Sequence, residues 1–479
     1  MKNLIEKIKK SWLIKRTSTI IFMISMVVLF IVVTLAINNL NLNPIDFTSE
    51  KLYTLTDTSK ERVKNIDKDV NIYFVSYSEN SAILDLAKQY HNENEKINVE
   101  IAKATERPDL VDKYGIEDET EGIIVESGER SKVLTQTDFY TYDTTTNDEI
   151  DITEEKLTNS ILYVVADEIP TVYLLEGYSN FSTSSNLRYL SMYLENEVTE
   201  LKTLNVLTEG QIPEDCNALI IMSPSKDFDE ITKNEIINYI NRGGNILWFN
   251  SAVTNNQELP NVNEVLGTYG IKPFDYGVIY ETDTSKMMYQ SPGIIIPTVN
   301  YSKITKNIPA ALLVNATKIN LVSDDELSSL NVTKTELMKT SDKAFFRKDL
   351  TIQSENKQTD EEEASFVVGV ELDKKIDEAN KKESKLVMYG ENLFVSDFTL
   401  SESSTAPIIS FSYNKDVAID SMAYLADRED DIVIRKNTNT TIYNATVEQN
   451  EIIQAIIFGV PVIIIAVGTI VWQHRRRKK

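Results

Sequence analysis

The residues that most often carry enzyme chemistry are scarce in this 479-residue chain. Its one cysteine, Cys216, cannot form an intrachain disulfide, and its two histidines, His91 and His474, are too few for a multi-histidine or cysteine–histidine metal centre. A nucleophile would have to be Cys216 activated by His91, or a serine, but the sequence contains no Gly-x-Ser-x-Gly elbow. We therefore expect no catalytic residue, no metal site and no cofactor.

The chain also lacks the glycine-rich patterns that hold nucleotides. No Gly-x-x-x-x-Gly-Lys-Ser/Thr loop is present, so any energy from ATP would have to come from a partner. The pair Gly243–Gly244 is too short for a dinucleotide fingerprint and follows a helical pattern, where glycine commonly ends a helix. The 73 carboxylates are so numerous that any chosen pair predicts a solvated surface rather than a glycosidase dyad or a calcium site.

Charge and hydropathy divide the chain into an acidic middle and two basic, apolar ends. Residues 19–37 and 452–472 contain no charged residue, and each is long enough to cross a hydrocarbon core of roughly 30 Å as a helix. The tails, residues 1–18 and 473–479, each carry a net charge of +5, which predicts that both termini are cytoplasmic. The residues between the spans carry a net charge of −34, and we expect them outside the cell membrane. Such an acidic surface argues against nucleic-acid binding.

A cleavable signal sequence or a buried core helix could also account for an apolar segment. The first segment is longer than a usual signal core and ends Ala-Ile-Asn-Asn rather than Ala-x-Ala, and buried helices are seldom free of charge over such a length. A few residues within the spans could contact partner helices in the membrane or satisfy only their own backbone. They are Ser25, Thr34, Gln454, Gly459 and Pro461.

Residues 38–150 predict a first α/β unit outside the membrane. The expected elements are a helix capped by Thr56 or Asp57, a strand at 70–77, a helix at 81–94, a strand at 97–104, a short helix at 108–116 and a hairpin at 121–134. The order β-α-β-α-β-β is that of a thioredoxin-like domain. No Cys-x-x-Cys precedes the helix at 81–94, so the likeness is one of shape and predicts no dithiol chemistry.

Residues 151–436 predict a second, doubly wound unit, with a β-rich insertion at about 280–380 in which we expect strands near 292–299 and 312–322. The expected elements are helices at 153–166, 184–196, 229–241, 263–274 and 416–430, and strands at 171–177, 199–207, 217–224, 245–251 and 385–398. We expect Ile231, Ile236, Ile237 and Ile240 on one side of their helix, 360–385 as an edge strand with a solvated loop, and 416–430 as amphipathic. A stalk at 437–451 leads to the second span.

This unit invites comparison with class I glutamine amidotransferases, whose nucleophilic cysteine lies at a strand-to-helix elbow. The corresponding turn here, after the strand at 217–224, reads Ser-Pro-Ser-Lys-Asp, and Cys216 lies before that strand. An amidotransferase-like unit with this turn would be catalytically empty.

Several segments, in this order along the chain, resemble the GldG-like ABC-transporter auxiliary family, which is named after a gliding-motility protein. They are DFTSEKLYTLTDTSKERVKNIDKDVNIYF, PTVYLLEGYSN, INYINRGGNILWF, VLGTYGIKP, KLVMYGENLFVSD, the helix AIDSMAYLADRED and the strand IVIRK. The family-motif positions, to which we assign structural roles, are Thr48, Tyr53, Leu55, Gly177, Gly243, Gly244, Gly270 and Asp397. Tyr178 stands where the family commonly has a histidine.

The resemblance implies a bacterial, two-span membrane protein whose exterior has thioredoxin-like and amidotransferase-like parts without catalysis. It implies two partners, a cytoplasmic ABC ATPase and an ABC-2-type permease, and it leaves the transported substrate open. We therefore expect a non-catalytic auxiliary subunit of an ABC-type transporter. The alternatives are a membrane-anchored surface sensor or envelope scaffold, and a membrane-anchored hydrolase.

Overall fold

The computed structural model describes residues 54–428, apart from 78–80, 117–120, 143–148, 253–257, 353, 378 and 402–405, and also positions 25, 28, 29 and 32. Among these residues we find no helix with both the length and the apolar character that crossing a bilayer requires. The predicted span at 452–472, the stalk and both tails lie outside the described residues. So does the predicted span at 19–37, except for those four positions.

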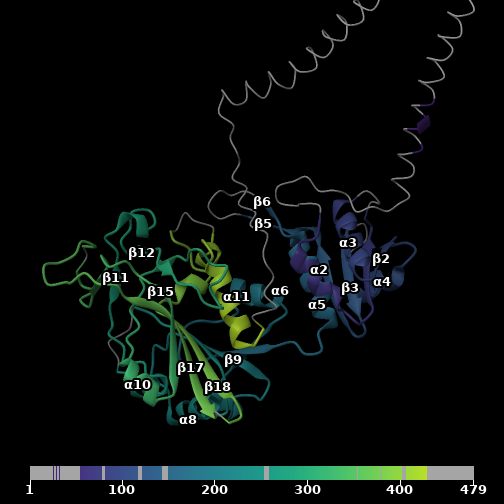
Figure 1. The fold of residues 1–479 in the computed structure, drawn as a ribbon. Helices are drawn as coiled ribbons and strands as arrows, with labels where there is room; N and C mark the ends of the chain where they lie inside the picture. Colours follow the sequence, from purple (N-terminus) through teal and green to yellow (C-terminus); the bar gives the residue numbers. More distant parts are fainter. Residues whose placement is uncertain are drawn as a thin grey trace, which may run out of the picture.

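The described chain is a mixed α/β structure, and its first part contains a four-stranded sheet (Figure 1). Its elements are α2 (Asp57–Lys64), β1 (Val70–Val75), α3 (Ala82–Glu93), β2 (Ile97–Ala102), α4 (Pro108–Tyr114), β3 (Gly122–Ser127) and β4 (Arg130–Thr135). The strand order is β2-β1-β3-β4, with β1 parallel to β2 and antiparallel to β3. These elements match the predicted order, including the helix capped by Thr56.

Helix α5 (Thr153–Val165) completes this first part and packs against β3 and β4. Side chains of α2, α3 and α5 share one hydrophobic core with the sheet, whereas Leu110 of α4 packs in a separate cluster. A partly buried polar contact joins α2 to α5, because the backbone N–H and the hydroxyl of Thr56 both donate to Glu154, at 2.7 and 2.8 Å. The start of the described chain is therefore tied to the helix that leads into the second part.

An eight-stranded sheet forms the second part, in the order β13-β15-β17-β18-β10-β9-β7-β8. Its strands are β7 (Thr171–Leu175), β8 (Glu200–Leu204), β9 (Cys216–Met222), β10 (Ile246–Phe249), β13 (Thr298–Val299), β15 (Val332–Lys339), β17 (Val367–Asp377) and β18 (Lys382–Tyr389). Neighbours from β8 to β18 pair in parallel, and those from β18 to β13 pair antiparallel. Parallel strands are normally buried on both faces, which explains the uninterrupted apolar runs in β7, β9 and β10.

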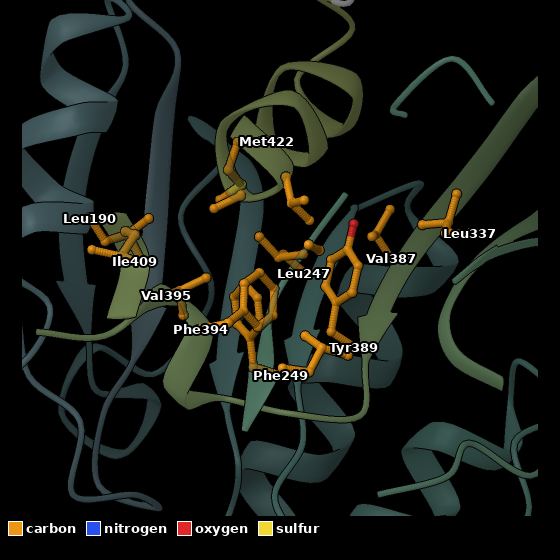
Figure 2. Close-up of a cluster of buried hydrophobic side chains, with 14 of the residues drawn as sticks. Leu190, Leu247, Phe249, Leu337, Val387, Tyr389, Phe394, Val395, Ile409 and Met422 are labelled. Carbon is orange, nitrogen blue, oxygen red and sulfur yellow. The ribbon is translucent and has the colours of Figure 1, made fainter. Parts of the chain in front are cut away.

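Helices cover both faces of this sheet, as the doubly wound prediction requires. On one side lie α6 (Arg188–Asn196) and α11 (Asn414–Leu425), and on the other lie α8 (Glu230–Asn241) and α9 (Pro260–Gly267). Figure 2 shows the first core, where Phe249, Tyr389 and Phe394 bring their rings together beneath Met422 of α11. The ring centroids of Phe249 and Phe394 are 5.4 Å apart, and those of Tyr389 and Phe394 are 5.1 Å apart.

Three details of the prediction are wrong. β17 is not an edge strand, because it pairs with β15 on one side and β18 on the other. Apart from the buried Glu371, its charged residues follow the buried run from Val368 to Leu372. Ile231 is 59% exposed, since it lies in the first turn of α8, and Ile236 and Ile240 make the core contacts. α11 is not amphipathic but buried on most sides, because it packs against the sheet, α6 and the short helix η4 (Ile408–Ser410).

The predicted insertion supplies β13, β15 and β17 to the main sheet. It also contains shorter elements outside that sheet, which are β11 (Val278–Tyr280), β12 (Ile294–Ile295), β14 (Leu313–Val314), α10 (Asp324–Ser329) and β16 (Phe345–Arg347). The strands expected near 292–299 and 312–322 are present but only two residues long, whereas β15 and β16 were not predicted.

Candidate functional site at the carboxyl edge of the parallel sheet

Four loops meet where strands β7, β9, β10 and β18 end, and we call this region the carboxyl edge. In doubly wound sheets ligands bind at this edge, where neighbouring strands lead into helices on opposite faces. The pair β7 and β9 meets that condition, because β7 leads to α6 on one face and β9 leads to α8 on the other. The helices that begin here would offer free backbone N–H groups to an anionic ligand.

Ser223 directly follows β9, at the place where an amidotransferase would carry its nucleophile. Its φ of +32° lies in a region that non-glycine residues seldom adopt, and its N–H donates to the carbonyl of Phe249 at 2.7 Å. A histidine that could activate a nucleophile lies elsewhere. His91 is on α3 of the first part, where its Nδ1 lies 2.8 Å from the carbonyl oxygen of Ile97. The loop has the shape of an elbow, but no histidine of the described chain is placed beside it.

Cys216 lies at the opposite end of β9, as predicted. The residue is 8% exposed, and its thiol donates to the hydroxyl of Tyr239 at 3.4 Å. Burial raises the pKa of Cys216 to about 11, so the thiol is protonated at neutral pH. The structure therefore does not bring Cys216 and His91 together.

Asp397 occupies the N-terminus of α6. Its carboxylate accepts hydrogen bonds from the backbone N–H groups of Arg188 and Tyr189, both at 3.1 Å, and from Nε of Arg188 at 3.0 Å. The Asp397 side chain is only 5% exposed. This contact joins the loop after β18 to the loop after β7 and gives the family-motif aspartate a structural role.

Asp229 caps α8 by accepting from the N–H groups of Ile231 and Thr232, both at 2.9 Å. The hydroxyl of Tyr178 donates to the Asp229 carboxylate, and its oxygen also lies 2.7 Å from Thr232 Oγ1. Burial alone would raise the pKa of Asp229, but hydrogen bonds, first that from Tyr178, hold it below its ordinary value. Burial and the bond to Asp229 raise the pKa of Tyr178 to about 12. Tyr178 thus supports a helix cap at the position where the family commonly has histidine.

Two further carboxylates cap the remaining helices of this edge. Asp227 accepts from the N–H groups of Asn261 and Val262 at the start of α9, at 3.1 and 3.0 Å. Glu391 accepts from the N–H groups of Leu393 and Phe394, at 2.6 and 2.7 Å, in the short helix η3 (Leu393–Val395). Burial raises the pKa of Glu391 to about 8, although the bonds from these N–H groups oppose the shift.

The common feature of this edge is that the chain itself fills its helix N-termini. The starts of α6, α8, α9 and η3 each bind a carboxylate from a neighbouring loop or cap, so these N–H groups are already satisfied. A phosphate or substrate carboxylate would have to displace one of these groups to bind there. No group of three or more metal-ligating side chains occurs in the part of the chain that the structure describes.

The other family-motif residues have structural places. Leu55 is 1% exposed in the hydrophobic core of the four-stranded sheet, and its N–H donates to Gln89 at 3.2 Å. Gly177, Gly243 and Gly270 have φ values of +94°, +88° and +79°. Gly243 and Gly244 end α8, as predicted, because their N–H groups donate back to the carbonyls of Ile240 and Tyr239.

The remaining predicted residues cannot be placed in a site. Ser25 is helical and exposed. Thr34, Thr48, Tyr53, Gln454, Gly459 and Pro461 lie outside the described residues. Sequence reasoning missed the roles of Asp227, Asp229 and Glu391. An aspartate just before a helical pattern could have indicated Asp229, but the caps of Asp227 and Glu391 depend on how the loops fold together.

Solved structures that resemble this chain include three distant examples. They are the N-terminal domain of mmIFT52 (13% identity, 53% of this chain and 97% of that one, TM-score 0.37), a putative GMP synthase protein from Thermoplasma acidophilum (10%, 55% and 97%, 0.27) and a putative ThuA-like protein from Parabacteroides merdae (10%, 54% and 90%, 0.31). No curated protein matches the chain.

Two family patterns match the sequence. Residues 49–144 match a domain of unknown function, DUF7088. Residues 169–419, more than half of the chain, match the family described as ABC-type uncharacterized transport system. This span runs from the start of β7 into α11 and so includes the carboxyl edge with all four of its capping carboxylates. The chain therefore belongs to the auxiliary family of ABC-type transport systems.

Proposed function

We propose that this protein is a non-catalytic auxiliary subunit of an ABC-type transporter. Family membership supports the transport role. The observation that carries the non-catalytic part is the self-capped carboxyl edge, where Asp397 fills the N-terminus of α6 and Asp229 fills that of α8. In doubly wound folds that bind a ligand at this edge, free N–H groups at helix N-termini bind it. In this protein the N–H groups at the starts of α6 and α8 bind carboxylates of the chain itself and so hold the loops in place.

The proposed partners are a cytoplasmic ABC ATPase and an ABC-2-type permease. The chain has no phosphate-binding loop of its own, and its predicted spans at 19–37 and 452–472, with basic flanks, would place both termini on the side of the ATPase. The main domain would then lie outside the cell membrane, over or beside the permease. In this arrangement it would bind a substrate or control its exit.

The finer fold assignment belongs to the same proposal. The first sheet pairs β1 parallel to β2 and antiparallel to β3, followed by the hairpin to β4, a pattern that supports a thioredoxin-like domain without a dithiol. The order β8-β7-β9-β10 with helices on both faces supports an amidotransferase-like domain without its nucleophile. Both parts would then serve as binding scaffolds.

The test is the composition of the material purified through an affinity tag on this chain in mild detergent. Mass spectrometry should find an ATPase and a polytopic permease with it. An unrelated two-span protein with the same tag, expressed in the same cells, controls for non-specific capture. A folded, homogeneous chain that comes out alone would contradict the proposal.

A further inference from the structure

A strained hairpin lies in the segment after β11. Its strands join through the N–H of Ile296, which donates to the carbonyl of Lys286 at 2.7 Å, and the N–H of Met288, which donates to Ile294 at 2.9 Å. The turn is closed by a 3.0 Å bond from the N–H of Ser291 to the carbonyl of Met288. Both residues between them are left-handed, with φ of +55° at Tyr289 and +56° at Gln290.

These angles are those of the hairpin turn in which glycine and asparagine are strongly preferred. A tyrosine and a glutamine adopt them only at a cost in backbone strain. Such strain persists where it has a use, and here it places a large side chain at the tip of a hairpin. We call residues 288–291 the tyrosine turn.

The same segment exposes apolar side chains. Tyr289 is 68% exposed and Tyr301 is 84% exposed, the two highest values among the large hydrophobic residues of the described chain. Met287 and Met288 are half-buried beside the turn. Tyrosine is favoured where one end of a side chain meets an apolar phase and the other meets water, and methionine adapts to irregular apolar contacts.

Charge sets this segment apart from the rest of the acidic region between the two predicted spans. Residues 284–323 contain four lysines and no aspartate or glutamate, although the whole chain has a net charge of −24. Lys303 and Lys306 are exposed, and Lys286 is half-buried with its Nζ 3.2 Å from Thr298 Oγ1. An anionic surface would repel most of this acidic protein and attract this segment.

We propose that residues 286–306 form a docking surface for the anionic headgroup layer of a lipid membrane. The rings of Tyr289 and Tyr301 would lie at headgroup depth, and the lysines would contact lipid phosphates. This inference rests on the membrane anchorage in the proposed function. Only residues 38–53 separate the first predicted span from the described domain, a length of at most roughly 55 Å when fully extended.

The test uses the full chain in lipid vesicles, with a nitroxide attached at position 289 through Tyr289→Cys. Cys216 stays unlabelled because its thiol is buried. In vesicles of phosphatidylglycerol and phosphatidylcholine, we expect the label to collide less with an aqueous nickel chelate and more with oxygen. In phosphatidylcholine alone this protection should fall several-fold. A label at Ile231→Cys, which is 59% exposed on α8, should report water in both lipids. A label at 289 that matches the one at 231 in both lipids would overturn the proposal.

A second variant separates lipid contact from fold stability. Tyr289→Asn with Gln290→Gly gives the tyrosine turn its preferred residues, so the thermal unfolding temperature should rise. In the same background, a label at Tyr301→Cys should lose several-fold of its protection by lipid. If stability rises and the protection is unchanged, the tyrosine turn does not dock and the proposal fails.

The two proposals fail in different ways. If the labels report water while the ATPase and permease co-purify, only the lipid-docking inference is wrong. If the label at 289 is protected while the chain purifies alone, only the proposed transporter role is wrong. A chain that does not float with vesicles of either composition overturns the membrane anchorage, and the docking inference with it.

Discussion

At the scale of single residues, Glu391 differs from the other capping carboxylates. It is 2% exposed, and the dominant effect on its pKa is burial, whereas hydrogen bonds prevail at Asp229. Its pKa of about 8 lies above the ordinary glutamate value of 4.5. The folded state therefore binds this proton more tightly than the unfolded state, and the stability that follows is present below pH 4.5 and is lost as the pH rises through 8.

We predict that this pH dependence disappears in Glu391→Gln. Between pH 5 and 8 the free energy of unfolding of the wild type should fall relative to that of the variant, by at most about 1.4 kcal/mol per pH unit. Urea unfolding of both proteins at several pH values measures the difference between their free energies of unfolding. Asp373 and Asp420, two other buried carboxyls with raised pKa, are present in both proteins, so their contributions cancel in this difference. Parallel curves for the two proteins would contradict the assignment.

Ser223 allows a direct test of the proposal that the protein is non-catalytic. Its left-handed backbone resembles a nucleophile elbow, but within the described chain no histidine lies beside it to accept a proton. We predict that a fluorophosphonate probe, which reacts with activated serines, leaves the purified protein unlabelled. Ser223→Ala is the control: labelling of the wild type that this variant abolishes would favour the membrane-anchored hydrolase.

At the scale of elements, the positions of helices and strands along the chain could be predicted from the sequence. Which elements pair or pack with one another in space was harder to predict. The continuous apolar runs of β7 and β9 and the amphipathic pattern of α3 were sufficient for those elements. β17 was misjudged because dense charge follows its apolar half, and pairing partners far along the chain place it inside the sheet. The caps depend on the same long-range contacts: Asp397 is 209 residues from Arg188, a pairing that no local pattern encodes.

The N-terminus of α6 should become an anion site when its own carboxylate is removed. Asp397→Ala leaves the N–H groups of Arg188 and Tyr189 without their acceptor, which should cost about 1–2 kcal/mol of stability. Added phosphate should then raise the unfolding temperature of the variant more than that of the wild type. Asp397→Asn, which keeps one acceptor oxygen, should lie between the two. Equal responses to phosphate would show that Asp397 does not block an anion site.

The glycines that end α8 offer a test of packing. A Cβ added at Gly244 would lie 2.4 Å from the ring of Tyr239, so Gly244→Ala should lower stability by about 2 kcal/mol or more. Gly267→Ala is the matched control, because nothing lies within 4 Å of the added atom and alanine favours the helix α9. Thermal unfolding of both variants compares them. Similar unfolding temperatures would mean that the ring of Tyr239 does not pack closely against Gly244.

At the scale of the whole molecule, polar contacts join the two described parts. Lys132 of β4 pairs with Glu195 at 2.6 Å, and Lys156 of α5 donates to Asn196 at 2.8 Å, both at the end of α6. Because α6 starts at the carboxyl edge and α5 is tied to α2, these contacts link the start of the described chain to the candidate site. The family match, over residues 169–419, covers most of the second part.

The measurement that tests the account most directly is the stoichiometry of the assembly that purifies through a tag on this chain. Our account predicts an ABC ATPase and a polytopic permease in near-equal amounts with it, with ATP hydrolysis present in the assembly and absent from the isolated chain. A folded chain that purifies without either of these partners, or one that hydrolyses a substrate by itself, would contradict the account.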